Sequence, residues 1–112
     1  MTVQDLIKSL DLTVLSGDEE ALSRPVTGGY CGDLLSWVMG RAPQDGAWFT
    51  IMSNLNVAAV AALTDISCVV LTEGVSPDPA LLERARKENL ALLQSPEGAF
   101  LLAGKLYAML HG

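Results

Sequence analysis

The stretch "AWFTIMSNLNVAAVAALTDISCVVLTEG", residues 47–74, contains two apolar segments separated by a run of small residues. Segments 47–52 and 67–72 are short and rich in apolar, β-branched or aromatic residues, which is typical of buried strands. Residues 57–63 between them read VAAVAAL, and a helix of such small side chains packs closely on a sheet. A strand, a helix and a strand joined by short connections predict a βαβ crossover with parallel strands.

The same alternation continues to the end of the chain, and helix and strand patterns also precede this stretch. Thr2 and Asp5 form a capping pattern at the start of the first helix, and Asp33 is placed to cap the second. The predicted helices are 2–10, 33–40, 57–63, 77–90 and 96–110, and the predicted strands are 12–17, 47–52, 67–72 and 91–95. We therefore predict an α/β fold with a mainly parallel sheet flanked by helices, in one domain over 1–112.

The charge balance argues against a nucleic-acid or membrane partner. The net charge is −6, and acidic residues border the one basic cluster, Arg84, Arg86 and Lys87. No apolar run reaches the roughly 20 residues of a membrane-spanning helix, and the N-terminus lacks a signal-peptide pattern. These features predict a cytoplasmic protein.

The residues that support metal binding or nucleophilic catalysis are scarce. Cys31 and Cys68 match no metal-ligand spacing, and the one histidine, His111, is the penultimate residue. Cys68 lies inside a predicted buried strand, while Asp33 near Cys31 opposes thiolate formation. The sequence thus predicts reduced cysteines, no metal, no cofactor and no catalytic residue.

Gly28 and Gly29, ahead of Tyr30 and Asp33, have two interpretations. A glycine pair exposes backbone N–H groups to an anion at a helix N-terminus, or it permits a turn with positive φ or a close backbone approach. The chain has neither the phosphate-binding GxxxxGK[ST] pattern nor the dinucleotide-binding GxGxxG pattern, and Asp33 would repel a phosphate. The backbone interpretation is therefore favoured.

Polar residues follow two of the predicted strands, at the edge where open α/β sheets bind ligands. Thr72 and Glu73 lie at the end of one strand, and Asn54 and Asn56 follow another, although Asn56 is also placed to cap a helix. The candidate ligand-binding residues are Gly28, Gly29, Tyr30, Asp33, Ser53, Asn54, Asn56, Thr72 and Glu73.

Half of the residues are hydrophobic, which leaves apolar surface for a small domain to cover. Trp37, Trp48 and Tyr107 are expected in the core or in an interface, because aromatic side chains bury large areas. A two-fold homodimer is the commonest way to cover such surface, so we predict one.

Three segments, "VTGGYCGDLLSWVMGRA", residues 47–78 and "LALLQSPEGAFLLAGKLY", together resemble the DRTGG domain over residues 24–107. Of the D-R-T-G-G residues after which the family is named, this chain has only a part, as Arg24, Thr27, Gly28 and Gly29. A Gln-x-His pattern often found before the asparagine in that family is replaced here by Met52, Ser53 and Asn54. A site that relies on an imidazole at that place is absent.

The resemblance implies a fold similar to the N-terminal domain of HPr kinase/phosphorylase, which lacks the kinase site, and to the module inserted in CBS-domain pyrophosphatases. It implies a non-catalytic regulatory or interaction domain that pairs with itself. Such a domain binds a small nucleotide-like or anionic ligand, or a metabolic partner protein. The alternative is a small enzyme acting on a phosphorylated or nucleotide substrate, with Asp33 and Glu73 as acid and base.

Overall fold

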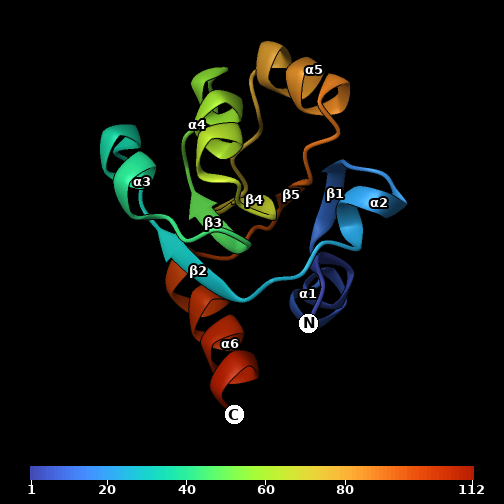
Figure 1. Cartoon of the computed structure of the whole chain (residues 1–112), viewed down its shortest axis with the longest axis vertical. Coiled ribbons are helices and arrows are strands. Elements are labelled where there is room, and N and C mark those ends of the chain that lie inside the picture. The colour runs from blue at the N-terminus through green and yellow to red at the C-terminus, as the bar shows by residue number, and fades with distance from the viewer.

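The computed structural model describes residues 1–112 and contains one five-stranded sheet (Figure 1). The strands are β1 (Thr13–Ser16), β2 (Gly28–Cys31), β3 (Gly46–Thr50), β4 (Cys68–Leu71) and β5 (Leu92–Gln94), in the spatial order β1-β5-β4-β3-β2. Strands β2 to β5 are parallel to their neighbours, and β1 is antiparallel to β5. The predicted α/β fold with a mainly parallel sheet is confirmed.

Helices cover both faces of this sheet. They are α1 (Val3–Leu10), α2 (Glu19–Leu22), α3 (Leu35–Arg41), α4 (Asn56–Thr64), α5 (Pro79–Lys87) and α6 (Ala99–His111). Figure 1 shows α3, α4 and α5 on one side of the sheet and α1 and α6 on the other. Each parallel crossover from β2 to β5 therefore passes over the same face, which leaves the second face to the two terminal helices.

Two hydrophobic cores lie on the two faces of the sheet, because successive strand residues point to opposite sides. Trp48 and Val69 point toward α3, α4 and α5, where they pack with Val57 and Leu81. Phe49, the next residue of β3, belongs to the opposite core with α1 and α6. The continuous apolar character of β3 and β4 follows from this burial on both faces.

Strand β2 is the one strand that the sequence did not predict. Residues 28–31 read GGYC, and we expected the two glycines to form a turn. They instead extend along β3, with Gly29 opposite Ala47 and Tyr30 opposite Trp48. Glycine has a low strand propensity, so the pairing with the buried β3 decides the conformation here.

The helix starts confirm one capping prediction and correct two others. Thr2 and Asp5 form a complete capping box on α1. Asp33 does not cap α3, which begins at Leu35 after the N-cap residue Leu34, because its carboxylate binds elsewhere. Asn56 is the first residue of α4 and not its cap.

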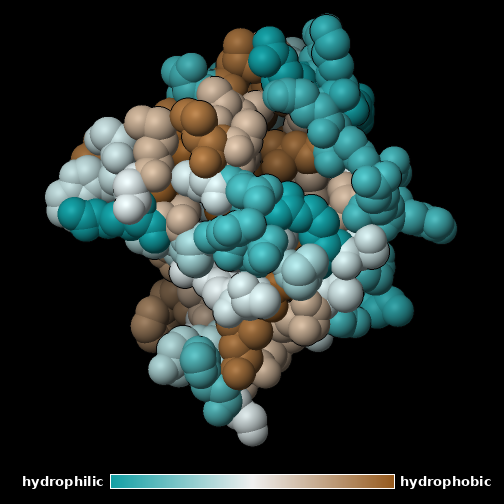
Figure 2. Space-filling view, viewed as in Figure 1, coloured by the Kyte–Doolittle hydropathy of each residue, from teal (hydrophilic) through white to brown (hydrophobic).

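Hydrophobic side chains remain exposed on the outer helices. Figure 2 shows brown atoms over α3 and α4 and again along α6. Trp48 is fully buried, as expected, whereas Trp37 and Tyr107 are 55% and 67% exposed, so neither belongs to the core. No helix combines the length and the apolar character required to cross a bilayer.

Arg24 connects its own segment to two turns, at Asp45 and at Asp65. Its guanidinium donates hydrogen bonds to the backbone oxygens of Ile66 and Asp65 and to the carboxylates of Asp45 and Asp65, at 3.0–3.1 Å. Asp45 and Asp65 both have left-handed backbones, with φ of 60° and 54°. Arg24, the arginine that matches the family's D-R-T-G-G motif, thus has a structural role in this chain, since it fixes the turns that precede β3 and β4.

Candidate functional site

Two adjoining hollows lie beside α6, on the face of the sheet that carries α1 and α6. One, here called the apolar hollow, has a volume of about 270 Å³, and the other, the polar hollow, about 230 Å³. Cys31 and Phe49 line both of them, so the two form one groove. The residues of the apolar hollow are Gly28, Gly29, Tyr30, Cys31, Phe49, Ala103, Leu106, Tyr107, Leu110 and His111.

The polar hollow lies at the carboxyl ends of three neighbouring parallel strands. The hollow is lined by residues 31–33 at the end of β2, by residues 49–51 at the end of β3, and by Thr72 and Glu73, which follow β4. The first residue of α6, Ala99, closes the hollow on the helix side. Three of the predicted ligand-binding residues, Asp33, Thr72 and Glu73, are therefore brought together, at the edge where α/β sheets bind ligands.

Asp33 is held in this hollow by two hydrogen bonds. Its Oδ1 atom accepts one from the Thr50 hydroxyl at 2.8 Å and one from the Ile51 backbone N–H at 3.0 Å. These bonds tie the segment after β2 to the end of β3. The position of the carboxylate is thus fixed by the sheet, which explains why Asp33 is not available to cap α3.

Glu73 has an unusual backbone conformation at the end of β4. Its φ is 56°, and Gly74 next to it has a φ of 72°. The Glu73 N–H donates to the Glu97 carbonyl at 2.8 Å, and the Gly74 N–H donates to the Ser95 carbonyl at 2.9 Å. A non-glycine residue in the left-handed region is uncommon, and such residues concentrate at binding and catalytic sites.

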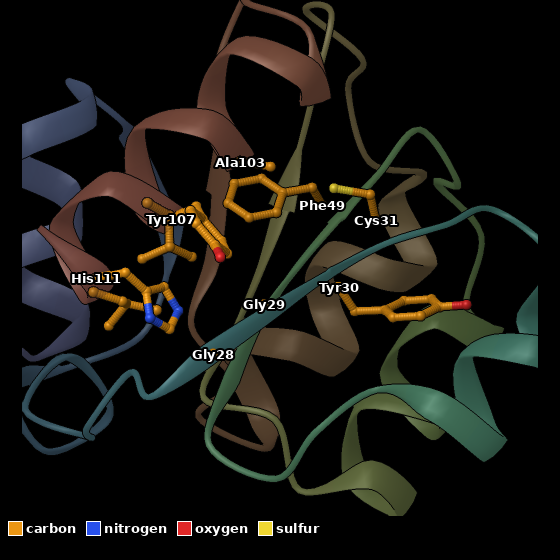
Figure 3. Close-up of a pocket in the computed structure, with 10 residues that line it drawn as sticks. Gly28, Gly29, Tyr30, Cys31, Phe49, Ala103, Tyr107 and His111 are labelled. Atoms are coloured by element: carbon orange, nitrogen blue, oxygen red, sulfur yellow. The ribbon is translucent and has the colours of Figure 1, made fainter.

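The apolar hollow lies between the edge strand β2 and the carboxyl-terminal half of α6 (Figure 3). Figure 3 shows Phe49, Tyr107 and His111 on one side of β2, with the ring of Tyr30 on the other. The Tyr107 and His111 rings lie 4.3 Å apart between centroids. Tyr30 packs instead in the core under α3, because strand residues alternate in direction.

The glycine pair does not have the positive φ that one interpretation expected, since the glycines with positive φ are Gly17 and Gly74. Close approach explains Gly29: a β-carbon there would lie 3.1 Å from Leu106 Cδ2 and 3.4 Å from the Ala47 carbonyl oxygen. At Gly28 the nearest atom, Pro43 Cγ, would be at 3.4 Å, which is ordinary contact. Neither glycine lies at a helix N-terminus, so the phosphate cradle has no structural basis.

The two cysteines differ in their environment, and both are free. Burial raises the pKa of the Cys68 thiol to about 12. Partial burial, together with the negative charge of Asp33, raises the pKa of Cys31. A raised pKa means less thiolate at neutral pH, which argues against Cys31 as a nucleophile although it lines the groove.

Three predicted site residues lie outside both hollows. Ser53 donates a hydrogen bond to Asp78 at 3.4 Å, and the Asn54 side chain accepts from the Asn56 N–H at 2.9 Å. The asparagines therefore shape the turn into α4. Ser53, Asn54 and Asn56 do not meet Asp33.

The sequence reasoning missed the contribution of α6 to the groove. Residues 103, 106, 107, 110 and 111 follow helical spacing and form one face of that helix. This periodicity was visible, but nothing in it distinguishes a groove wall from a core face. The opposite wall of the groove is β2, which was itself not predicted as a strand.

Comparisons with known proteins agree with this architecture. The family model described as the DRTGG domain matches residues 5–109. The structure is similar to that of the CBS and DRTGG domains of the regulatory region of Clostridium perfringens pyrophosphatase, complexed with the activator diadenosine tetraphosphate. The TM-score is 0.74 at 14% sequence identity, over 91% of this chain and 44% of that one.

This likeness is one of fold, and the chain spans less than half the length of the pyrophosphatase region. No curated protein matches the chain in sequence. The family match extends beyond the resemblance noted over 24–107, because it includes most of α1 and all of β1. The chain belongs to the DRTGG domain family.

Proposed function

We propose that this chain is a non-catalytic regulatory domain that binds a small nucleotide-like ligand in the groove beside α6. The observation that carries the proposal is the meeting of three parallel strand ends, with Asp33, Thr72 and Glu73, at one hollow next to an apolar one. Ligands in α/β sheets bind at such strand ends, and binding sites combine an apolar surface with a few polar groups.

The similar pyrophosphatase region supports this proposal, since that protein is a regulatory region and is complexed with a nucleotide activator. We infer that residues 1–112 act as one domain, because both cores pack on one sheet. The two free thiols fit a reducing compartment, which favours the cytoplasm.

Thermal unfolding with and without ligands tests the proposal. A ligand that binds only the folded state raises the melting temperature, so nucleotides, sugar phosphates and inorganic phosphate form the panel. We expect Ala103→Phe to abolish the shift, because Ala103 lines the apolar hollow. Ala108→Phe, on an exposed part of α6 outside the hollow, is the matched control. No shift with any nucleotide would refute nucleotide binding and favour a protein partner.

We also propose that the domain works as a homodimer. Exposed apolar side chains support this, among them Trp37 on α3, which is 55% exposed, and Leu34 just before this helix, which is 61% exposed. Light scattering after size-exclusion chromatography should give twice the mass of one chain, and Trp37→Glu should shift the mass toward that of one chain. A single-chain mass for the unmodified protein at micromolar concentration would refute the dimer.

An enzymatic role is a second candidate, and one observation favours it: Asp33 and Glu73 line the same hollow. Two carboxylates in one site can act as the general acid and the general base of an enzyme. Product formation from nucleotides or sugar phosphates, lost in both Asp33→Asn and Glu73→Gln, would support this role. Turnover that survives both substitutions would reject it.

A further inference from the structure

The Thr72 hydroxyl is a buried polar group without a partner in the protein. Thr72 is 1% exposed and lines the polar hollow, yet its side chain takes part in no hydrogen bond. The one side-chain oxygen that is both fully enclosed and unpaired belongs to Ser16, so the Thr72 oxygen still touches the hollow. Buried hydroxyls nearly always have a hydrogen-bond partner, so the Thr72 hydroxyl is available to a molecule that occupies the hollow.

The two carboxylates of the hollow also have unused acceptor atoms. Both hydrogen bonds to Asp33 end on Oδ1, which leaves Oδ2 free, and the Glu73 carboxylate has no hydrogen bond or ion pair. No lysine or arginine lines this hollow. The site therefore repels phosphate and carboxylate groups and favours a group that donates hydrogen bonds.

The neighbouring apolar hollow has an exposed aromatic side chain in its wall. Tyr107 projects into it beside His111 (Figure 3), while Phe49, which lines both hollows, is buried in the core. Aromatic side chains of this kind stack on nucleobases. A ligand that spans the groove thus has a planar part at one end and hydroxyl donors at the other.

We infer that the groove recognises the nucleoside part of its ligand, with the ribose hydroxyls in the polar hollow and the base in the apolar hollow. This rests on the proposed function and makes it more specific. A carboxylate that accepts from ribose hydroxyls is an established device of nucleotide sites on parallel sheets. Any phosphates attached to the nucleoside lie outside the polar hollow, away from Asp33 and Glu73.

Calorimetric titration of the full chain tests this assignment. The probes are the four common ribonucleosides, their 2′,3′-dideoxy counterparts and their 5′-monophosphates. We expect a ribonucleoside to bind about tenfold more tightly than its dideoxy counterpart, since hydrogen bonds to charged groups contribute that much or more. The monophosphate should bind no more tightly than the nucleoside. Equal affinity of ribose and dideoxy compounds would overturn the inference and leave nucleotide binding itself intact.

Two variants locate the interaction. Thr72→Val keeps the shape of the side chain and removes the hydroxyl, and Glu73→Gln removes the charge. Each should reduce the preference for ribose severalfold, while Glu97→Gln, exposed and outside the hollow, should preserve it. Because Thr72 has no partner in the protein, Thr72→Val should not lower the melting temperature. An unchanged ribose preference in both variants would place the ligand elsewhere. Absence of binding by every probe would refute both the inference and the proposed function.

Discussion

Gly29 of β2 lies against Leu106 of α6, so closely that a side chain on Gly29 would crowd the leucine. A β-carbon on Gly29 would lie 3.1 Å from Leu106 Cδ2, and Leu106 itself is 2% exposed. The close approach of helix and edge strand forms the floor of the apolar hollow. This gives the second glycine of the pair a packing role that requires no unusual φ.

Gly29→Ala should therefore destabilise the ligand-free protein. Overpacking at a buried contact costs about 1–3 kcal/mol, and we expect the low end of this range because the leucine methyl can shift slightly. Urea denaturation measures the change in the free energy of unfolding. Gly28→Ala is the matched control and should cost less, since its β-carbon meets Pro43 Cγ at 3.4 Å. Equal losses in both variants would contradict this account.

Arg24→Lys should lower stability by about 1–2 kcal/mol, because a lysine cannot reproduce the planar set of hydrogen bonds to the turns at Asp45 and Asp65. Arg84→Lys serves as the control. Its ion pair with Glu88 is exposed and 3.9 Å long, and such pairs contribute little. Denaturation midpoints that fall equally in the two variants would show that the Arg24 contacts have no special weight.

Thiol alkylation should distinguish the two cysteines. With iodoacetamide at pH 8, Cys31 should react slowly and Cys68 only on unfolding, because burial raises the pKa of both thiols. Asp33→Asn removes a negative charge that also raises the pKa of Cys31, so its alkylation should accelerate severalfold. Mass spectrometry of timed samples gives both rates. Fast alkylation of Cys68 in the folded protein would contradict the buried placement.

Asp18 should make stability depend on pH in the acid range. Hydrogen bonds from the Asn89 side chain and the Ala21 N–H lower the pKa of Asp18 from its ordinary 3.8. A lowered folded-state pKa contributes stability above the unfolded value, and that stability is lost as the pH falls through the folded pKa.

The Asp18→Asn variant should consequently show a flatter loss of stability than the unmodified protein below about pH 4. Denaturation midpoints at a series of pH values measure the slope. Glu19→Gln, a neighbouring carboxylate without a hydrogen bond to it, is the control and should keep the original slope. An identical slope in all three proteins would show that Asp18 does not contribute.

The strands that the sequence indicated most clearly are those whose burial leaves a nearly continuous apolar run. Strands β3 and β4 are buried on both faces, so their residues are apolar except for Thr50 at the end of β3, and the small residues of α4 pack against them. β2 was not predicted because its two glycines have no hydrophobic side chains. At the exposed edge of the sheet, burial also does not require a regular alternation of apolar and polar residues. Edge strands with small residues are the least visible elements in a sequence.

The sequence also predicted a part of the candidate site. Asp33, Thr72 and Glu73 could be grouped because parallel strands bring their carboxyl ends to one edge. Ser53 and Asn54 follow β3 at the same edge, but they turn toward α4 and α5. The direction of a loop after a strand depends on the local hydrogen bonds, which the order of residues along the chain does not reveal. The wall formed by α6 depends on long-range packing.

The pairing of β1 with β5 has a consequence for how the molecule is assembled during synthesis. Thr13 pairs with Gln94, and Val14 with Leu93, so β1 has no partner until β5 has been synthesised. Strands β2 to β5, each joined to the next by a single helix, bring together segments that are close along the chain. We expect this parallel unit to assemble early and the amino-terminal strand to dock late. The sheet therefore cannot close until β5 has been synthesised.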